Sequence, residues 1–257
     1  ETGEDIQTHV FHRVTDRLWM VVFKPDVGGS YTLRVHHPRI LSFEEVVHVF
    51  LRGSSGRTIG ADGLQLTVKP DSPYGVMFVQ LARVTVPAVA SMPQWGDAWR
   101  IRPEATPVDD RVELTLPVGG ENAPKARIYR KSGSGWRYVG GKKQGGYLTA
   151  SVRTFGVYAV LEDTRAPVIK ELSPPDDYHA KTQRPIIHAI ISDVGSGISS
   201  YGITANGQWL LAAYDPDTKR LTWERDQELP SGDQKLVYRV VDNVGNETRI
   251  QRMIHIP

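Results

Sequence analysis

Three short stretches near the C-terminal end decide the fold: Asp163-Thr-Arg-Ala-Pro-Val-Ile169, Ser192-Asp-Val-Gly-Ser-Gly-Ile198 and Val241-Asp-Asn-Val-Gly-Asn246. The proline of the first stretch has no N–H to donate, which suits the opening of an edge strand in a new domain. The other two are Asp- and Gly-rich turns between apolar, alternating segments. Together they predict an antiparallel β-sandwich over residues 164–257.

Strand candidates recur about every ten residues through the rest of the chain, a spacing typical of sandwiches rather than of βαβ units. In residues 111–116 the apolar side chains Val112, Leu114 and Leu116 share one face, as in a half-buried strand. Asn206-Gly207 signals a tight hairpin, because both residues accept positive φ. The expected strands include 18–23, 31–35, 64–68, 111–116, 126–129, 147–152 and 156–160, and we expect 43–50 to be a strand or a single helical turn.

Two polar stretches, 52–57 and 162–167, predict the domain boundaries. We expect an all-β chain of tandem sandwiches: an N-terminal β region at 4–58, a middle sandwich at 59–163 and a last sandwich at 164–257. The N-terminal region is interpreted as a small or truncated β-domain packed on the middle one, with extra strands on the middle sandwich as the alternative. The second linker has no Gly or Ser run, so we expect a restricted orientation between the last two domains.

Composition narrows the class of protein. The 257 residues are 40% hydrophobic and 23% charged, as in ordinary globular proteins, and the net charge of +2 gives no field that favours nucleic acid. No apolar run approaches the ~20 residues of a membrane span. Cysteine is absent, which excludes a disulfide framework and a thiolate site and favours a bacterial origin. The start at Glu1-Thr-Gly3 is interpreted as a processed end of part of a larger protein, for which we expect a secreted, periplasmic or cell-surface location.

The middle region carries Asp62-Gly-Leu-Gln-Leu-Thr-Val-Lys-Pro70, Trp99-Arg-Ile-Arg-Pro-Glu104 and Thr154-Phe-Gly-Val-Tyr-Ala-Val160. This order resembles the sandwich domain shared by netrin receptors and ankyrins, which has a similar opening, a central Trp and a closing aromatic strand. Gly156 departs from that pattern, since a small hydroxyl residue is usual there. The resemblance implies a domain that makes protein–protein contacts.

The last region carries Asp193-x-x-Ser-Gly-Ile198, Tyr214-Asp-Pro216 and Asp242-x-x-Gly-Asn246. It resembles the immunoglobulin-like repeat of bacterial envelope proteins. The order of the two domains is similar to that found downstream of the lysostaphin-type zinc endopeptidases of bacterial cell walls. The resemblance implies an accessory segment that accompanies a neighbouring activity.

Four aromatic residues are candidate binding residues. Trp136 and Tyr138 lie two apart, hence on one face of a strand, and could form a platform for a sugar ring. Trp95 and Trp99 are candidates for an exposed protein-binding face. For each pair the alternative is a place in the hydrophobic core, which we favour because large aromatics dominate sandwich cores.

The aspartate-rich turns of the last region are a candidate metal site. Asp193 and Asp242, with Asp215 and Asp217, suggest calcium, which takes six to eight oxygen ligands. The alternative, which we favour, is that each Asp caps its own turn by accepting backbone N–H bonds. No metal ion and no other cofactor is therefore predicted.

Catalysis has little support in the sequence. His12-Arg-Val-Thr-Asp16 matches the His-x3-Asp pair of the lysostaphin-type enzymes, but the chain has no His-x-His and a third zinc ligand cannot be named. A hydrolase using His12 and Asp16 is the least favoured hypothesis. We expect a non-catalytic spacer and protein-interaction module of a bacterial secreted or cell-envelope protein. The alternative is a glycan- or peptidoglycan-binding module accessory to a cell-wall hydrolase.

Overall fold

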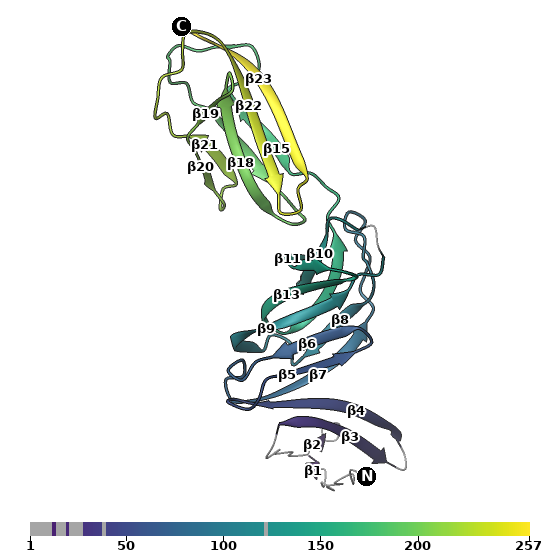
Figure 1. Cartoon of the computed structure of the whole chain (residues 1–257). Helices are drawn as coiled ribbons and strands as arrows, with labels where there is room; N and C mark the ends of the chain where they lie inside the picture. The colour runs from purple at the N-terminus through teal and green to yellow at the C-terminus, as the bar shows by residue number, and fades with distance from the viewer. Residues whose placement is uncertain (1–11, 14–18, 21–27, 38–39, 121–122) are drawn as a thin grey trace.

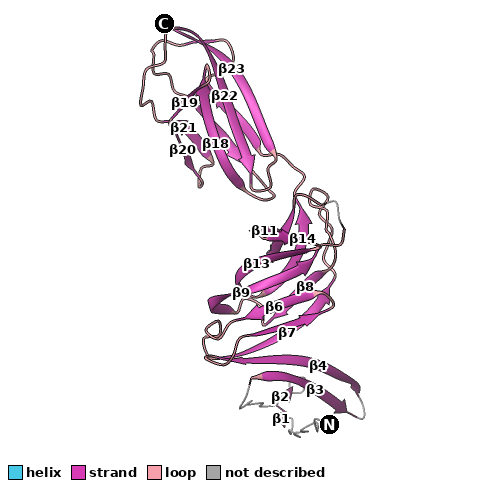
Figure 2. Ribbon diagram, viewed as in Figure 1, coloured by secondary structure: helices cyan, strands magenta, loops and turns pink. Residues whose placement is uncertain are grey.

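The structure is a computed structural model, and it describes residues 12–13, 19–20, 28–37, 40–120 and 123–257. Every regular element in this part of the chain is a β-strand, as Figure 2 shows by its colouring. The all-β expectation is thereby confirmed. Two two-residue strands, β1 (His12–Arg13) and β2 (Trp19–Met20), pair with each other, and they include the only described residues of the strand expected at 18–23.

The middle sandwich consists of a seven-stranded and a five-stranded antiparallel sheet. The first has the order β11-β10-β14-β8-β7-β4-β3 and the second β12-β13-β9-β6-β5. The strands of the first are β3 (Gly29–His37), β4 (Ile40–Leu51), β7 (Val76–Val84), β8 (Ala98–Arg102), β10 (Ala126–Ser132), β11 (Gly135–Gly140) and β14 (Gly156–Glu162). Those of the second are β5 (Arg57–Ala61), β6 (Leu64–Val68), β9 (Pro107–Pro117), β12 (Lys142–Gln144) and β13 (Tyr147–Thr154).

Period-two patterning explains how these sheets pack. Val112, Leu114 and Leu116 of β9 are at most 1% exposed, while Glu113 between them is exposed. They meet residues of the facing sheet, such as Ile101 and Ile128, in one continuous core. The alternation of apolar and polar side chains therefore places one face of each strand between the two sheets.

The described strands of the N-terminal region extend the seven-stranded sheet. β4 is hydrogen-bonded to β7, with Val49 opposite Phe78, and β3 pairs with β4. Residues 43–50 lie in a strand rather than a helical turn, as their β-branched content favours. This pairing is the extra-strand alternative for the N-terminal region, and the division into domains at residue 58 remains a prediction.

The last sandwich has its own core between a four-stranded sheet, β15-β17-β21-β20, and a five-stranded sheet, β16-β23-β22-β18-β19. The first contains β15 (Val168–Ser173), β17 (His188–Ser192), β20 (Ala212–Asp215) and β21 (Arg220–Trp223). The second contains β16 (Tyr178–His179), β18 (Ile198–Ala205), β19 (Gln208–Leu210), β22 (Gly232–Asp242) and β23 (Glu247–Ile256). The hairpin expected at Asn206-Gly207 joins β18 to β19, and both residues have positive φ.

The two sandwiches follow each other along an elongated molecule, and the linker after β14 connects them (Figure 1). The end of β14 and the β10–β11 hairpin face the turn between β22 and β23 and the loop that follows β17. Within the described residues, no helix is long and apolar enough to cross a membrane.

Candidate functional site

An open groove of about 540 Å³ lies where the two sandwiches meet. On one side it is lined by the β10–β11 hairpin, including Trp136 and Tyr138. On the other side it is lined by the loop that follows β17, from Asp193 to Gly197. Residues from both domains therefore form one concave surface.

The loop after β17 is shaped by its own aspartate. Asp193 Oδ2 accepts hydrogen bonds from the N–H groups of Gly195, at 3.0 Å, and of Gly197, at 2.6 Å. Gly197 has φ of 83°, a conformation that glycine adopts without a steric penalty. This turn leaves Ser196 buried, at 2% exposure, beneath the groove.

The turn between β22 and β23 is built in the same way. Asp242 Oδ1 accepts N–H bonds from Val244, at 2.9 Å, and from Asn246, at 2.8 Å. The side chain of Asn243 then donates to the carbonyl oxygens of Ser196 and Gly197, at 2.8 and 3.0 Å. The two Asp-led turns of the last sandwich are thus joined to each other.

Asp163, directly after β14, brings the linker against both turns. Its Oδ2 accepts the N–H of Ser196 at 2.6 Å, and its backbone carbonyl accepts a bond from Asn246 Nδ2 at 3.0 Å. A Cβ added to Gly195 would lie 2.1 Å from Asp163 Oδ2, so only glycine fits beside this carboxylate. Asn246 also accepts a hydrogen bond from Lys125 Nζ of the middle sandwich.

Three carboxylates therefore meet at the junction of the domains. Oxygens of Asp163, Asp193 and Asp242 all lie within 4.8 Å of one another. Asp163 and Asp242 are 1% and 2% exposed, and Asp193 is half-buried. Burial raises the pKa of Asp193, the Gly197 N–H bond opposes the rise, and the like charges of Asp163 and Asp242 add to it.

Tyr129, whose ring contacts Tyr138 of the groove, carries a buried phenol. Tyr129 of β10 is fully buried, and its Oη has no hydrogen-bond partner among the described residues. Burial raises the pKa of this phenol strongly, and Asp163, Asp193 and Asp242 all raise it further. Tyr138 packs against its ring edge-to-face, at 5.6 Å between centroids.

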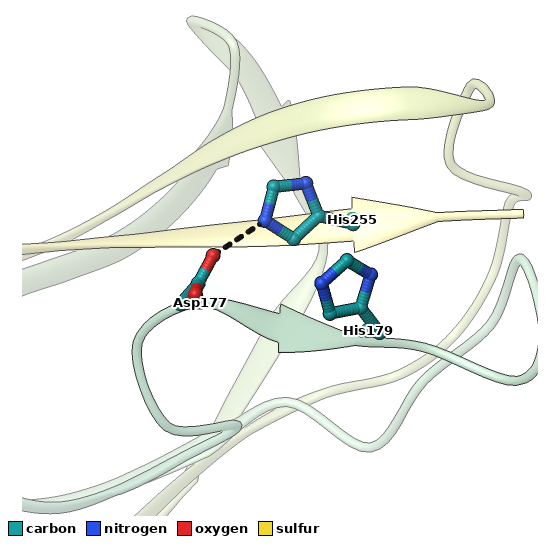
Figure 3. A group of neighbouring side chains, drawn as sticks. All are labelled: Asp177, His179 and His255. Atoms are coloured by element: carbon teal, nitrogen blue, oxygen red, sulfur yellow. Dashed lines mark hydrogen bonds and ion pairs between the residues drawn. The ribbon is translucent and has the colours of Figure 1, made fainter.

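A second cluster lies far from the junction, near the end of β23. There His255 is within 2.7 Å of two carboxylate oxygens, Asp177 Oδ1 at Nε2 and Asp233 Oδ1 at Nδ1, and His179 stacks on it at 4.3 Å. Figure 3 shows Asp177, His179 and His255, with the Asp177–His255 contact dashed. Asp177, His179 and His255 have the composition of a metal site.

The charge state of His255 decides whether this second cluster can bind a metal ion. Ionised carboxylates only accept hydrogen bonds, so both ring nitrogens of His255 must carry protons. The bonds to Asp177 and Asp233 accordingly raise the pKa of His255, and the bond to His255 lowers the pKa of Asp177. A doubly bonded imidazolium has no lone pair for a metal ion, so we interpret this cluster as an exposed ionic network.

The four aromatic candidates lie at different depths. Trp99 is 1% exposed and belongs to the middle core, so it does not contribute to an exposed face. Trp95 is half-buried against the same core, and its Nε1 donates to Glu162 Oε2 at 3.0 Å. Trp136 and Tyr138 are half-buried, pack on the outer face of the seven-stranded sheet and line the junction groove.

The turn-capping interpretation is confirmed for Asp193, Asp242 and Asp215. Asp193 and Asp242 accept N–H bonds within their own turns, and Asp215 does so from Asp217 at 2.9 Å. An aspartate that caps its own turn can also lie next to another carboxylate, and the structure does bring Asp193 and Asp242 together. The proposed zinc pair is not described: Asp16 and the side chain of His12 lie outside the described residues.

A family model matches the middle sandwich. Residues 50–163 match the family model of the Zu5-like domain, a β-sandwich family. One similar solved structure is of fibronectin(III)-like modules of CbhA from Clostridium thermocellum, at 16% identity, with 60% of this chain and 91% of that chain covered and a TM-score of 0.28. No curated protein matches the chain. The likeness to netrin receptors, ankyrins and proteins with lysostaphin-type endopeptidases remains a prediction.

Sequence reasoning missed Asp163 as a member of the acidic cluster. Asp163 lies in the predicted linker, 30 residues before Asp193, and no local pattern connects it with the two turns. The available signal was its position at the end of a strand, next to a domain boundary. The His255 cluster was also missed, because its members come from β16, β22, β23 and a loop.

Proposed function

We propose that this chain is a non-catalytic segment of tandem β-sandwiches from a bacterial secreted or cell-envelope protein. It acts as a spacer of fixed geometry and as a protein-interaction module. The observation that carries the proposal is the network around Asn246, which ties the middle sandwich, the linker and the last sandwich together. The match of residues 50–163 to a β-sandwich family supports the modular part of the proposal.

The Asn246 network restricts the angle between the domains. Asn246 is 7% exposed, donates to the linker at Asp163 and to Asp242 in its own domain, and accepts from Lys125 of the middle sandwich. Thr248 of β23 adds a bond to the carbonyl of Pro167. Swinging the domains apart would break the bonds of Asn246 to Asp163 and Lys125, at about 1–3 kcal/mol for each polar group left unpaired.

Distances between spin labels test the fixed geometry. The chain has no cysteine, so Gln144→Cys and Asp217→Cys place one label on an exposed site of each sandwich without competing thiols. We expect a narrow distance distribution that broadens when Asn246→Ala is added. A broad distribution in the parent double-cysteine protein would show that the chain is a flexible tether and would refute the spacer role.

The outer face of the seven-stranded sheet offers a surface for a protein partner. Val76 and Phe78 are 56% and 36% exposed there. Phe78 also lines a groove of about 330 Å³, together with Val47, Gln80, Arg102 and Pro103. Exposed apolar side chains beside a groove are typical of interaction sites.

A photo-crosslinking amino acid at position 78 of the protein, introduced in the cells that normally express it, tests this face. The matched control is position 113 on β9, an exposed residue of the opposite sheet. We expect a discrete adduct from position 78 and none from position 113. Equal labelling from both positions would mean that no partner prefers this face.

A glycan ligand is the second candidate, because Trp136 and Tyr138 both line the junction groove. Aromatic rings that line an open groove can stack on sugar rings. Titration with muropeptides should then quench or shift tryptophan fluorescence in the parent protein but not in Trp136→Ala. No change at millimolar ligand would remove this candidate.

A further inference from the structure

We propose that Asp163, Asp193 and Asp242 form a calcium site at the junction of the two sandwiches. This inference goes beyond the proposed function, since the Asn246 network exists without an ion. Calcium would add an electrostatic bond between the linker, which carries Asp163, and two turns of the last sandwich. The ion would thereby regulate the stiffness of the junction.

The spacing of the oxygens suits one ion. Calcium binds oxygen ligands at about 2.3–2.6 Å, so two ligands on opposite sides of it are separated by about 5 Å. Oxygens of the three carboxylates lie within 4.8 Å of one another. They also come from three separate segments, the end of β14, the loop after β17 and the end of β22.

The local charge is unbalanced without a cation. No lysine or arginine of the described part of the chain forms an ion pair with any of the three carboxylates. The ammonium of Lys125 donates to Asn246 instead. Backbone N–H groups satisfy only some of the lone pairs, and Asp193 Oδ1 receives no hydrogen bond from the described residues. Buried like charges resist joint ionisation, whereas a divalent ion stabilises all three.

Two buried hydroxyl groups supply an independent indication. Tyr129 Oη and Ser196 Oγ have no hydrogen-bond partner among the described residues, and their residues are 0% and 2% exposed. Tyr129 packs edge-to-face against Tyr138, which lines the same groove as Asp193 and Ser196. The Ser196 amide donates directly to Asp163 Oδ2. The unpaired, buried hydroxyl group of Ser196, next to the carboxylate of Asp163, indicates a ligand that needs further oxygen donors.

The chemistry of the donors selects the ion. Every group at the cluster is an oxygen donor, with no imidazole or thiol, which favours hard cations over zinc or copper. Magnesium requires near-ideal octahedral geometry, whereas calcium accepts irregular sets of carboxylate, hydroxyl, carbonyl and water oxygens. The groove at Asp193 provides the route from solvent.

Calcium titration of the chelator-treated full chain tests the site. We expect binding with a Kd on the order of 0.1–1 mM, the range of extracellular calcium modules, and a rise in the unfolding temperature with calcium but a weaker one with magnesium. Terbium gives a second readout, because Trp136 and Tyr138 line the same groove as Asp193 and can sensitise its luminescence. Absence of both calcium binding and sensitised terbium emission overturns the proposal.

Asp193→Asn is the decisive variant, because the amide oxygen can still accept the N–H bonds that shape the turn. Asp215→Asn is the matched control, since Asp215 caps an exposed turn of the same sandwich in the same way. We expect calcium binding at least about tenfold weaker in the first variant and unchanged in the second. Equal loss in both variants would mean nonspecific binding and contradict the site.

Asp163→Asn provides a further variant if Asp193→Asn folds poorly, which its circular dichroism spectrum reports. It removes a carboxylate from the linker instead of the loop, and we expect the same loss of terbium emission. Full terbium emission in a folded Asp163→Asn protein would refute the junction site. The spin-label distances of the unsubstituted protein do not depend on whether calcium binds. The calcium site and the spacer of fixed geometry can therefore be refuted separately.

Discussion

The imidazole of His255 is the residue whose titration should be easiest to observe. Bonds to Asp177 and Asp233 raise its pKa above the ordinary 6.5, and His255 in turn lowers the pKa of Asp177 below the ordinary 3.8. The network contributes its full stabilisation of the folded protein at pH values between these two ordinary pKa values, 3.8 and 6.5. This stabilisation is lost as the pH rises through the raised pKa of His255, and again as the pH falls through the lowered pKa of Asp177.

NMR titration of the His255 ring checks this prediction. In Asp177→Asn we expect the pKa of His255 to fall towards its ordinary value, because the first of its two carboxylate partners is gone. Asp217→Asn, which changes an exposed carboxylate elsewhere in the same sandwich, should leave the titration as it is. An ordinary pKa for His255 in the parent protein would contradict the network.

Gly195 is the glycine at which an added methyl group should lower the free energy of unfolding most. Its Cβ would overlap the buried carboxylate of Asp163, which cannot move without losing the Ser196 bond. We expect Gly195→Ala to lower the free energy of unfolding by about 1–3 kcal/mol, as overpacking usually does. Gly202→Ala is the control, because nothing lies within 4 Å of an added Cβ there. Chemical denaturation of both variants measures the difference, and similar values would show that the loop simply shifts.

Two turns of the last sandwich behave as one element because Asn243 connects them. Its side chain donates to the carbonyls of Ser196 and Gly197, and its backbone N–H donates to Gly197 as well. Asn243→Ala removes the two side-chain bonds, at about 1 kcal/mol for each. We expect faster hydrogen exchange at the amides of Gly195 and Gly197, measured by mass spectrometry or NMR. Unchanged exchange there would mean that Asp193 alone holds the loop.

Most strands could be predicted from the sequence, because their patterns are local. The expected segments 31–35, 64–68, 111–116, 126–129, 147–152 and 156–160 are confirmed within β3, β6, β9, β10, β13 and β14. The pairing of β4 with β7 could not be predicted, since alternation shows that a strand has a buried face and not which strand lies beside it.

The candidate site was predictable only in part, for a similar reason. Asp193 and Asp242 were recognised as turn residues from their Gly-rich neighbours. The approach of Asp163 depends on how the two sandwiches dock, which no short stretch encodes. The favoured core position of Trp95 and Trp99 agrees with the structure, because large aromatic side chains dominate sandwich cores.

The junction should make the two sandwiches unfold as coupled units. Each has its own hydrophobic core, so each could unfold separately, but Asn246 ties them through Asp163 and Lys125. Asn246→Ala leaves buried polar groups without partners, and we expect it to lower the stability of the last sandwich by about 1–3 kcal/mol. The middle sandwich should be affected less, because its core contains none of these residues.

Differential scanning calorimetry separates these effects. In the parent protein we expect closely spaced or merged transitions, and in Asn246→Ala a transition of the last sandwich that moves to lower temperature and away from the other. Asn206→Gly is the matched control, because it removes side-chain hydrogen bonds from the same sandwich at a hairpin away from the linker, where positive φ suits glycine. It should lower the same transition without altering the spin-label distance distribution, whereas Asn246→Ala should change both. If both variants leave that distribution narrow, the Asn246 bonds do not set the angle between the domains, and packing along the linker must do so instead.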